Sequence, residues 1–177
     1  MHIGGALLLL FCVSQPSVAF EGDYIWDERF KAGLAQARSG QADDQYALGD
    51  MYFRGRGTPT DHAQALHWFL LAAEQGHQQA AYKVGYLLLY GEKLEHAPAR
   101  ALDWFRRSAL AGHVPAQYEL GKLLFSGRAG PRDKARALKW LGKAKAAKYA
   151  PAEAEFRQTV SRLIKQQTEQ QGTTSPR

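Results

Sequence analysis

Apolar residues recur along parts of this chain with the period of an amphipathic helix. In the stretch ALHWFLLAA, the apolar residues Ala65, Trp68, Phe69, Ala72 and Ala73 are spaced i, i+3, i+4, i+7 and i+8. This spacing places all five on one side of an α-helix. The stretch is therefore predicted to be a helix that buries one broad face against a neighbouring element.

The same pattern recurs every 36 residues, so the chain contains an internal repeat. Self-similarity at a fixed period of about 20–50 residues is typical of stacked supersecondary units, which bury their apolar faces against one another. Four sets of positions keep this register: Tyr46, Tyr82 and Tyr118; Leu48-Gly49, Val84-Gly85 and Leu120-Gly121; Gly55, Gly91 and Gly127; and Trp68, Trp104 and Trp140.

Each unit is predicted to form two helices joined by a short loop. A glycine that follows the first helix suits a left-handed C-terminal cap. The loop proline, Pro59 or Pro131, is expected at the first position of the second helix, and Thr58 with Asp61 resembles a capping box. The expected first helices and their glycines are 44–53 with Gly55, 80–89 with Gly91, and 116–125 with Gly127.

A glycine also lies inside each first helix, at Gly49, Gly85 and Gly121. Glycine in a helix costs about 0.5–1 kcal/mol relative to alanine, so its presence at one register in all three units needs a local cause. We expect close approach of the second helix, with its tryptophan filling the space that a side chain would occupy.

In these residues the chain resembles the Sel1-like repeat family, whose members are relatives of the tetratricopeptide (TPR) solenoid. The family pattern is approximately A-x-x-x-L-G-x-x-Y-x-x-G-x-G-V, followed by D-x-x-x-A-x-x-W-Y-x-x-A-A-x-x-G. The resemblance covers roughly residues 40–157 and implies an all-α fold, a right-handed α/α superhelical solenoid of TPR-like helix pairs. The first unit matches at Leu48, Gly49, Tyr52, Gly55, Gly57, Asp61, Ala65, Trp68, Ala72, Ala73 and Gly76, and the later units depart at Lys93, Ala97, Ala129, Lys145 and Lys148.

The units are expected to be flanked by half pairs, because terminal repeats of such arrays are usually atypical and polar on the outside. Three full pairs and two half pairs would give about eight helices. The polar C-terminal end is predicted to be a disordered tail. The predicted organisation is a signal peptide (1–19), an N-terminal capping helix (20–39), three repeats (40–75, 76–111 and 112–147), a C-terminal capping helix (148–165) and the tail (166–177).

The N-terminus has the features of an export signal. An apolar run, Ile3 to Val13, is followed by Ser17-Val18-Ala19, which resembles a signal-peptidase site. The run is too short to span a bilayer, so cleavage near Ala19 and a periplasmic location are expected, with retention as an uncleaved hydrophobic N-terminus as the alternative. Cys12 suggests a lipoprotein, but the bulky Phe11 before it is unfavourable. If cleavage falls after Ala19, the mature chain contains no cysteine and therefore no disulfide.

The formal net charge of +6 is unevenly distributed. Residues 20–111 carry 10 basic and 12 acidic residues, whereas residues 112–177 carry 13 basic and 5 acidic residues. A basic C-terminal half could dock on an acidic protein, an anionic glycan or a peripheral lipid surface, or it could be an ordinary solvated surface. Nucleic acid is not expected as a partner, because an exported protein rarely meets it.

Signatures of catalysis or of metal binding are not found in the sequence, and no cofactor is expected. His77 and His113 share a register but would be separated by helix-packing distances of about 8–10 Å, too far for one metal ion, so we interpret both as polar turn residues. Asp43-Asp44 is interpreted as negative charge at a helix N-terminus. Some Sel1-like proteins are reported to hydrolyse β-lactams, but that group has paired cysteines in each repeat, and Ser161 lacks the lysine of an S-x-x-K motif.

Residues that vary between the units at fixed registers are candidates for a partner-binding surface. Three variable columns on the first helices are spaced by three, four and seven residues, so they share one helix face, and in related solenoids the first helices line the concave face. Tyrosine and arginine are over-represented among binding hot spots. The candidate partner-binding residues are Asp50, Arg54, Lys83, Tyr86, Tyr90, Glu119 and Lys122.

The function that we expect is an exported, monomeric scaffold that binds a protein or peptide in the bacterial cell envelope, without enzyme activity. Two alternatives stay open: an envelope hydrolase of the Sel1-like β-lactamase type, and a docking module for anionic glycan or lipid through the basic C-terminal half. The candidate face could also be a solvated surface without a partner.

Overall fold

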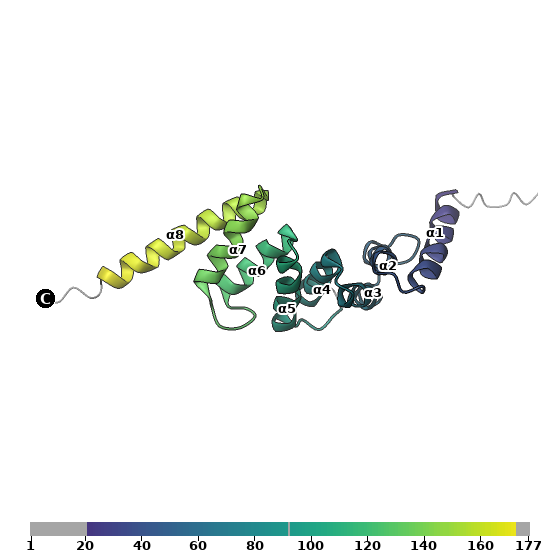
Figure 1. Ribbon diagram of the computed structural model, residues 1–177, viewed down its shortest axis with the longest axis horizontal. Helices are drawn as coiled ribbons and strands as arrows, with labels where there is room; N and C mark the ends of the chain where they lie inside the picture. The colour runs from purple at the N-terminus through teal and green to yellow at the C-terminus, as the bar shows by residue number, and fades with distance from the viewer. Residues whose placement is uncertain (1–20, 92, 173–177) are drawn as a thin grey trace, which may run out of the picture.

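The computed structural model describes residues 21–91 and 93–172, and the predicted signal peptide lies outside these residues. The described chain is all-α, and its helices follow one another along one direction, with α1 and α8 at opposite ends of an elongated array (Figure 1). The eight helices found in these residues are α1 (Glu21–Ala37), α2 (Ala42–Arg54), α3 (His62–Glu74), α4 (Gln78–Tyr90), α5 (Pro98–Leu110), α6 (Val114–Ser126), α7 (Lys134–Ala146) and α8 (Ala150–Gly172).

Packing occurs mainly between helices that are consecutive in the chain. Three pairs, α2 with α3, α4 with α5 and α6 with α7, form the repeats, and α1 and α8 flank them as half pairs. The prediction of an all-α solenoid with about eight helices is therefore confirmed. No helix in the described ranges is long and apolar enough to span a membrane.

The glycine inside each first helix is a contact point between the two helices of a pair. A Cβ atom on Gly49 would lie 2.7 Å from the ring of Phe69, and one on Gly85 would lie 2.9 Å from the ring of Phe105. Leu141 occupies the same place against Gly121, at 2.7 Å. Close approach of the second helix is thus the reason for these glycines.

The tryptophans do not fill this space, so that part of the sequence prediction is wrong. Trp68, Trp104 and Trp140 are only partly buried, whereas the next residue in each helix has no exposed surface. Successive helical residues are separated by about 100° around the axis, so only one of the two adjacent bulky residues can face the partner helix.

A second aromatic contact recurs where one pair meets the next. Tyr46 of α2 stacks on His77 with ring centroids 4.5 Å apart, and Tyr82 of α4 lies 4.9 Å from His113. His77 is the N-cap of α4, and its Nδ1 accepts a hydrogen bond from the backbone N of Ala80. Burial lowers the pKa of His113, the N-cap of α6. Both histidines therefore take part in ring packing, whereas only His77 caps a helix through its side chain.

The start signals of the second helices differ from the prediction. Asp61 is the N-cap of α3, where its carboxylate accepts hydrogen bonds from the backbone N of Ala63 and of Gln64, and Thr58 is not the cap. Pro59 lies three residues before α3, and Pro131 lies three residues before α7. A carboxylate next to the first turn satisfies free N–H groups, which a proline cannot do. Only the second unit starts its second helix with proline, at Pro98.

The left-handed C-terminal cap is confirmed at two of the three predicted glycines. Gly55 has φ 68° and Gly127 has φ 73°, whereas Gly91 has φ −66° and an extended backbone, so the prediction is wrong there. In that unit Lys93, at the place of Gly57, adopts φ 58° instead. The turn after α4 therefore takes its left-handed residue from later in the loop.

Lys148 is held in a conformation that lysine disfavours. Its φ is 58°, at the register where the earlier units have Gly76 and Gly112 with φ near 90°. A left-handed residue other than glycine costs about 1–2 kcal/mol. Because glycine also gains freedom in the unfolded chain, we expect Lys148→Gly to raise the free energy of unfolding by about 0.5–1 kcal/mol, as measured by urea denaturation. Lys139→Gly, inside α7, should instead lower it by about 1 kcal/mol, and equal effects would contradict a role for the left-handed backbone.

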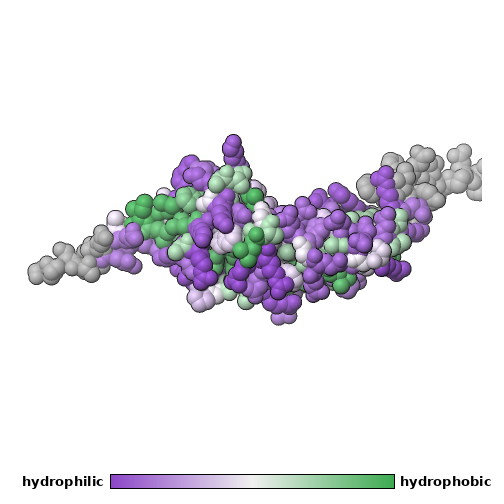
Figure 2. Space-filling view, viewed as in Figure 1, coloured by the Kyte–Doolittle hydropathy of each residue, from purple (hydrophilic) through white to green (hydrophobic). Residues whose placement is uncertain are grey.

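The C-terminal helix is longer than predicted. α8 continues to Gly172, so the prediction of a disordered tail is wrong for residues 166–172, and residues 173–177 lie outside the described residues. Extending an existing helix needs no new nucleation, and Gln166 accepts a hydrogen bond from Lys134 of α7. Ile164 is 57% exposed, and hydrophobic surface gathers at this end of the array in Figure 2.

Candidate interaction surface on the first helices

The structure brings the seven predicted partner-binding residues together in one continuous row. We call them the first-helix row, because all of them lie on α2, α4 and α6, the first helices of the three repeats. Each member contacts at least one other member or a ring between them. The row consists of Asp50, Arg54, Lys83, Tyr86, Tyr90, Glu119 and Lys122.

The end of the row on α2 is built around one carboxylate. Asp50 pairs with Arg54 at 2.8 Å and with Arg56 at 3.6 Å, and Lys83 of α4 approaches it to 4.0 Å. The Lys83 ammonium also lies 4.2 Å from the centroid of the Phe53 ring. Burial lowers the pKa of Lys83, although the charge of Asp50 opposes this shift. Three cations face one carboxylate here, so this end is basic.

Aromatic rings form the middle of the row on α4. Tyr86 and Tyr90 have ring centroids 5.2 Å apart, and Tyr86 meets Phe53 of α2 edge-on at 6.1 Å. Tyr82 continues the strip toward the buried side, 6.3 Å from Tyr86. Tyr90 is 38% exposed, so its ring can be reached from solvent. The middle of the row is thus a partly exposed aromatic strip with few rotatable bonds.

The row continues onto α6 through a hydrogen-bonded cluster. The Tyr90 hydroxyl donates to Oε2 of Glu119 at 3.2 Å, and Lys122 Nζ donates to the same carboxylate at 3.2 Å. Burial, together with the charge of Glu119, raises the pKa of Tyr90. Burial alone would lower the pKa of Lys122, but the charge and hydrogen bond of Glu119 outweigh it and the pKa is raised. Both side chains therefore keep their protons at neutral pH.

The structure adds Phe53 and Arg56 to this surface, which the sequence did not select. Phe53 lies at the end of α2, where the later units have Leu89 and Phe125, so it looked like a core position. Arg56 lies in the loop after α2, outside the helical registers that were compared. Phe53 is the penultimate residue of α2, and a comparison that included this register could have found it.

A shallow cavity of about 150 Å³ lies beside the α6 end of the row. Its charged lining consists of three cations, Lys122, Arg128 and Arg162, and two carboxylates, Glu119 and Glu155, and Tyr90 also lines it. Cations therefore outnumber carboxylates by one at this end. Across the described ranges, no three His, Cys, Asp or Glu side chains are grouped closely enough to hold a metal ion. The arrangement of rings flanked by charges suits the binding of a peptide or protein surface.

Three segments of the chain, residues 42–77, 78–113 and 114–149, match the Sel1 repeat family. They cover more than half of the chain, which therefore belongs to the Sel1 repeat family. Each segment begins at the first residue of α2, α4 or α6, two residues after the boundary expected from the sequence. Sel1 repeats generally mediate protein–protein interactions, and no catalytic family is evident from these matches.

Relatives share the fold and differ in length. A Sel1 repeat protein from Oxalobacter formigenes superposes with a TM-score of 0.67 at 27% identity, over 73% of this chain and 53% of that chain. A protective antigen of uropathogenic Escherichia coli strains, described as displaying an SLR fold, gives a TM-score of 0.63 at 36% identity, over 67% of this chain and 25% of that one.

A curated relative is the ERAD-associated E3 ubiquitin-protein ligase component HRD3A of Arabidopsis thaliana. It is 42% identical over 55 residues, which are 30% of this chain and 8% of the plant protein. The chain thus spans about half or less of the length of each of these relatives.

Proposed function

We propose that this protein is an exported Sel1-repeat scaffold that binds a protein or peptide partner in the bacterial cell envelope through the first-helix row. The observation that carries the proposal is the continuity of the row. Residues that differ from repeat to repeat form one connected surface across three helices, while recurring apolar residues such as Leu48, Val84 and Leu120 lie in the core. Such a surface leaves the fold intact when its residues change, as a recognition surface requires.

The chemistry of the row favours a protein partner. Aromatic side chains that lose little entropy on binding, flanked by charged groups, are typical of interaction hot spots. The rings of Tyr86 and Tyr90 supply apolar area, and the Tyr90 hydroxyl already has a hydrogen-bond partner in Glu119. A partner can therefore cover the ring without leaving its polar atom unpaired.

Photo-crosslinking tests the surface in the native envelope. A photoreactive amino acid at position 90 is expected to capture a defined protein, because the Tyr90 ring is exposed at the middle of the row. At position 110 the same group should not capture that protein, since Leu110 is 70% exposed but belongs to α5, outside the row.

The captured protein then provides the quantitative test. With purified components, Tyr86→Ala combined with Tyr90→Ala should weaken binding by roughly 30-fold or more. Truncating a hot-spot residue costs about 2 kcal/mol or more of binding free energy, which corresponds to this change in the dissociation constant. Leu110→Ala is the matched control and should leave the dissociation constant unchanged. Unchanged binding by the tyrosine double variant, with a normal circular dichroism spectrum, would exclude the row as the binding surface.

Export is part of the proposal and rests on the apolar N-terminal run and the Ser17-Val18-Ala19 sequence. The protein recovered from the periplasmic fraction should have the intact mass of a chain that begins at Phe20. A chain of full mass in the cytosolic fraction would contradict this part of the proposal and leave the binding test unaffected.

A further inference from the structure

A second cavity lies away from the first-helix row, between α5, α6 and the loop that leads into α7. Its volume is about 250 Å³, and Leu102, Leu123 and Leu124 form its apolar floor. Drug-sized ligands occupy pockets of roughly 300–1,000 Å³, whereas a cavity of about 150 Å³ already holds a benzene ring. The space therefore fits one large apolar side chain better than a whole small-molecule ligand.

The preceding repeat shows what this cavity lacks. Thirty-six residues earlier, the positions of Arg106 and Gly130 are occupied by Leu70 and Leu94. Both leucines are partly buried and pack against the hydrophobic core, and Leu94 reaches back toward Gly91. At the cavity, Gly130 has no side chain at the position that Leu94 occupies one repeat earlier, and Arg106 stands at the position that Leu70 occupies one repeat earlier. The cavity is thus a site that the neighbouring repeat fills with its own leucines.

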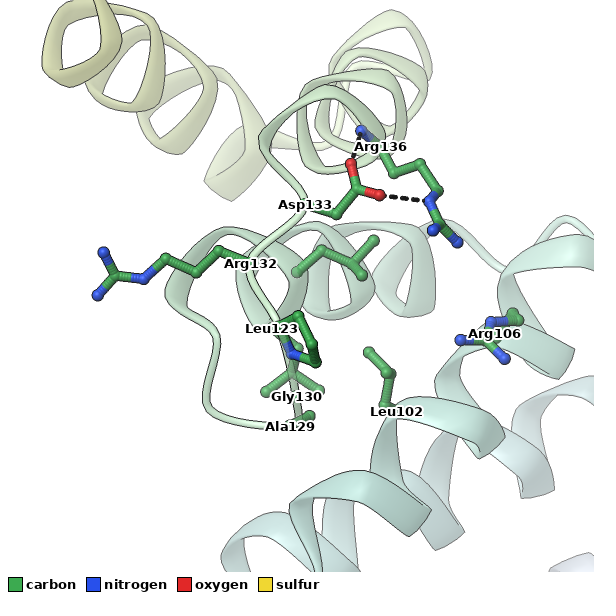
Figure 3. Close-up of a pocket in the computed structure, with 10 residues that line it drawn as sticks. Leu102, Arg106, Leu123, Ala129, Gly130, Arg132, Asp133 and Arg136 are labelled. Atoms are coloured by element: carbon green, nitrogen blue, oxygen red, sulfur yellow. Dashed lines mark hydrogen bonds and ion pairs between the residues drawn. The ribbon is translucent and has the colours of Figure 1, made fainter. Parts of the chain in front are cut away.

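Most of the charged side chains that line the cavity are arginines. Arg106, Arg132 and Arg136 line it, with Asp133 as the one carboxylate in the lining. Figure 3 shows the ends of Arg106 and Arg136 on the same side of the cavity, whereas Arg132 extends in the opposite direction.

The carboxylates near these arginines are already engaged. Both oxygens of Asp133 accept hydrogen bonds from Arg136, one from the backbone N at 2.8 Å and one from the side chain. Asp103 pairs with Arg106 at 3.1 Å on the exposed surface of α5. The cavity lining as a whole carries three arginines and one carboxylate, and Arg136 is its contribution from α7. A partner that supplies negative charge would therefore complement this site.

We infer that this cavity binds an acidic peptide segment of a partner protein, with one leucine-sized side chain inserted between Leu102, Leu123 and Leu124. The inserted side chain takes the place that Leu94 fills in the preceding repeat. Carboxylates next to it in the peptide pair with Arg106 and Arg136. Asp103 uses only Nη1 of Arg106, and Asp133 uses only Nε of the Arg136 side chain, so each guanidinium keeps further N–H donors for a second carboxylate. The inserted side chain makes binding specific for a peptide with a leucine-sized residue, and the arginines orient the peptide through its carboxylates.

Fluorescence polarisation with defined peptides tests this inference. The probe is a labelled Gly-Asp-Glu-Leu-Glu-Asp-Gly peptide, and its comparison peptide has alanine in place of leucine. The leucine peptide should bind at least about tenfold more tightly, because burying a leucine side chain is worth more than one decade in affinity. Equal affinity of the two peptides would mean that charge alone is recognised, and would overturn the inference.

Two variants of the protein locate the site. Ala129→Leu adds a side chain in the lining of the cavity, and Arg106→Glu reverses the charge beside it; each should weaken binding of the leucine peptide by more than about tenfold. Arg157→Glu makes the same charge change on α8, where Arg157 is exposed and does not line the cavity, and should change the affinity less than about twofold. Circular dichroism checks that each variant is folded.

The tyrosines of the first-helix row provide a further control on where the peptide binds. The combined Tyr86→Ala and Tyr90→Ala variant should bind the peptide normally, since neither tyrosine lines the cavity. Loss of peptide binding in that variant would assign the peptide to the first-helix row and overturn the inference. Wild-type binding by Ala129→Leu would also overturn it. If vesicles containing phosphatidylglycerol or a second copy of the chain bind in an Arg106-dependent way and the peptide does not, the occupant is a membrane or a dimer partner instead.

Discussion

Replacing Phe105 by alanine is expected to lower the free energy of unfolding by about 3–5 kcal/mol. The side chain has no exposed surface and lies between α5 and α4, where its ring is in contact with Gly85. A glycine opposite the ring cannot move a side chain into the vacated space, so the lost burial adds to the cost of a cavity. Urea denaturation followed by circular dichroism measures the change, and the melting temperature should fall by roughly 10 °C.

Leu110→Ala is the matched control for this prediction. Leu110 lies on the same helix and is 70% exposed, so its truncation should change the free energy of unfolding by less than about 0.5 kcal/mol. If Phe105→Ala lowers the free energy of unfolding by less than about 1.5 kcal/mol, α4 and α5 close the vacated space, and the contact between the Phe105 ring and Gly85 is not rigid.

Replacing Gly85 by alanine should destabilise the protein, although alanine is the better helix former. Propensity alone favours alanine by about 0.5–1 kcal/mol. The new methyl group would lie 2.9–3.1 Å from three atoms of the Phe105 ring, which is itself fully buried and cannot turn away. Overpacking of this kind costs about 1–3 kcal/mol, so we expect a net loss of about 1–2 kcal/mol in urea denaturation.

A double-mutant cycle shows whether the ring causes this loss. With Phe105→Ala already present, Gly85→Ala should become neutral or stabilising, since the methyl group then fills vacated space. Gly142→Ala is the positive control, because a Cβ there meets only Phe156 at an ordinary 3.7 Å, and it should gain about 0.5–1 kcal/mol. The same penalty for Gly85→Ala in both backgrounds would assign it to something other than the ring.

The sequence was sufficient to predict the helix pairs, because recurrence every 36 residues reports directly on stacking. It was not sufficient to choose between two adjacent bulky residues. Trp68 and Phe69 both recur as large apolar positions, and only the rotation of the helix decides that Phe69 meets Gly49. Local turn chemistry was similarly undetermined, since Asp61 and Thr58 are both acceptable caps and the loop path selects Asp61.

The sequence was sufficient to predict that the seven residues of the first-helix row share a face, because spacings of three, four and seven residues place positions on one side of a helix. Their role in binding stays a prediction. The connections within the row were not predictable. Tyr90 and Glu119 belong to different registers, and their hydrogen bond depends on how far α6 is displaced along α4. The cavity lined by Leu102 and Arg106 was also missed, because it arises from a side chain that Gly130 lacks rather than from a motif that is present.

The consecutive packing of the helices makes the array modular. Helices contact mainly their neighbours in the chain, so each interface depends on the residues of two consecutive helices. Gain or loss of one whole 36-residue unit would therefore lengthen or shorten the protein without requiring new kinds of interface. Recognition surfaces in such a protein can be extended in discrete steps, one helix pair per step, and relatives of very different lengths can share the same local architecture.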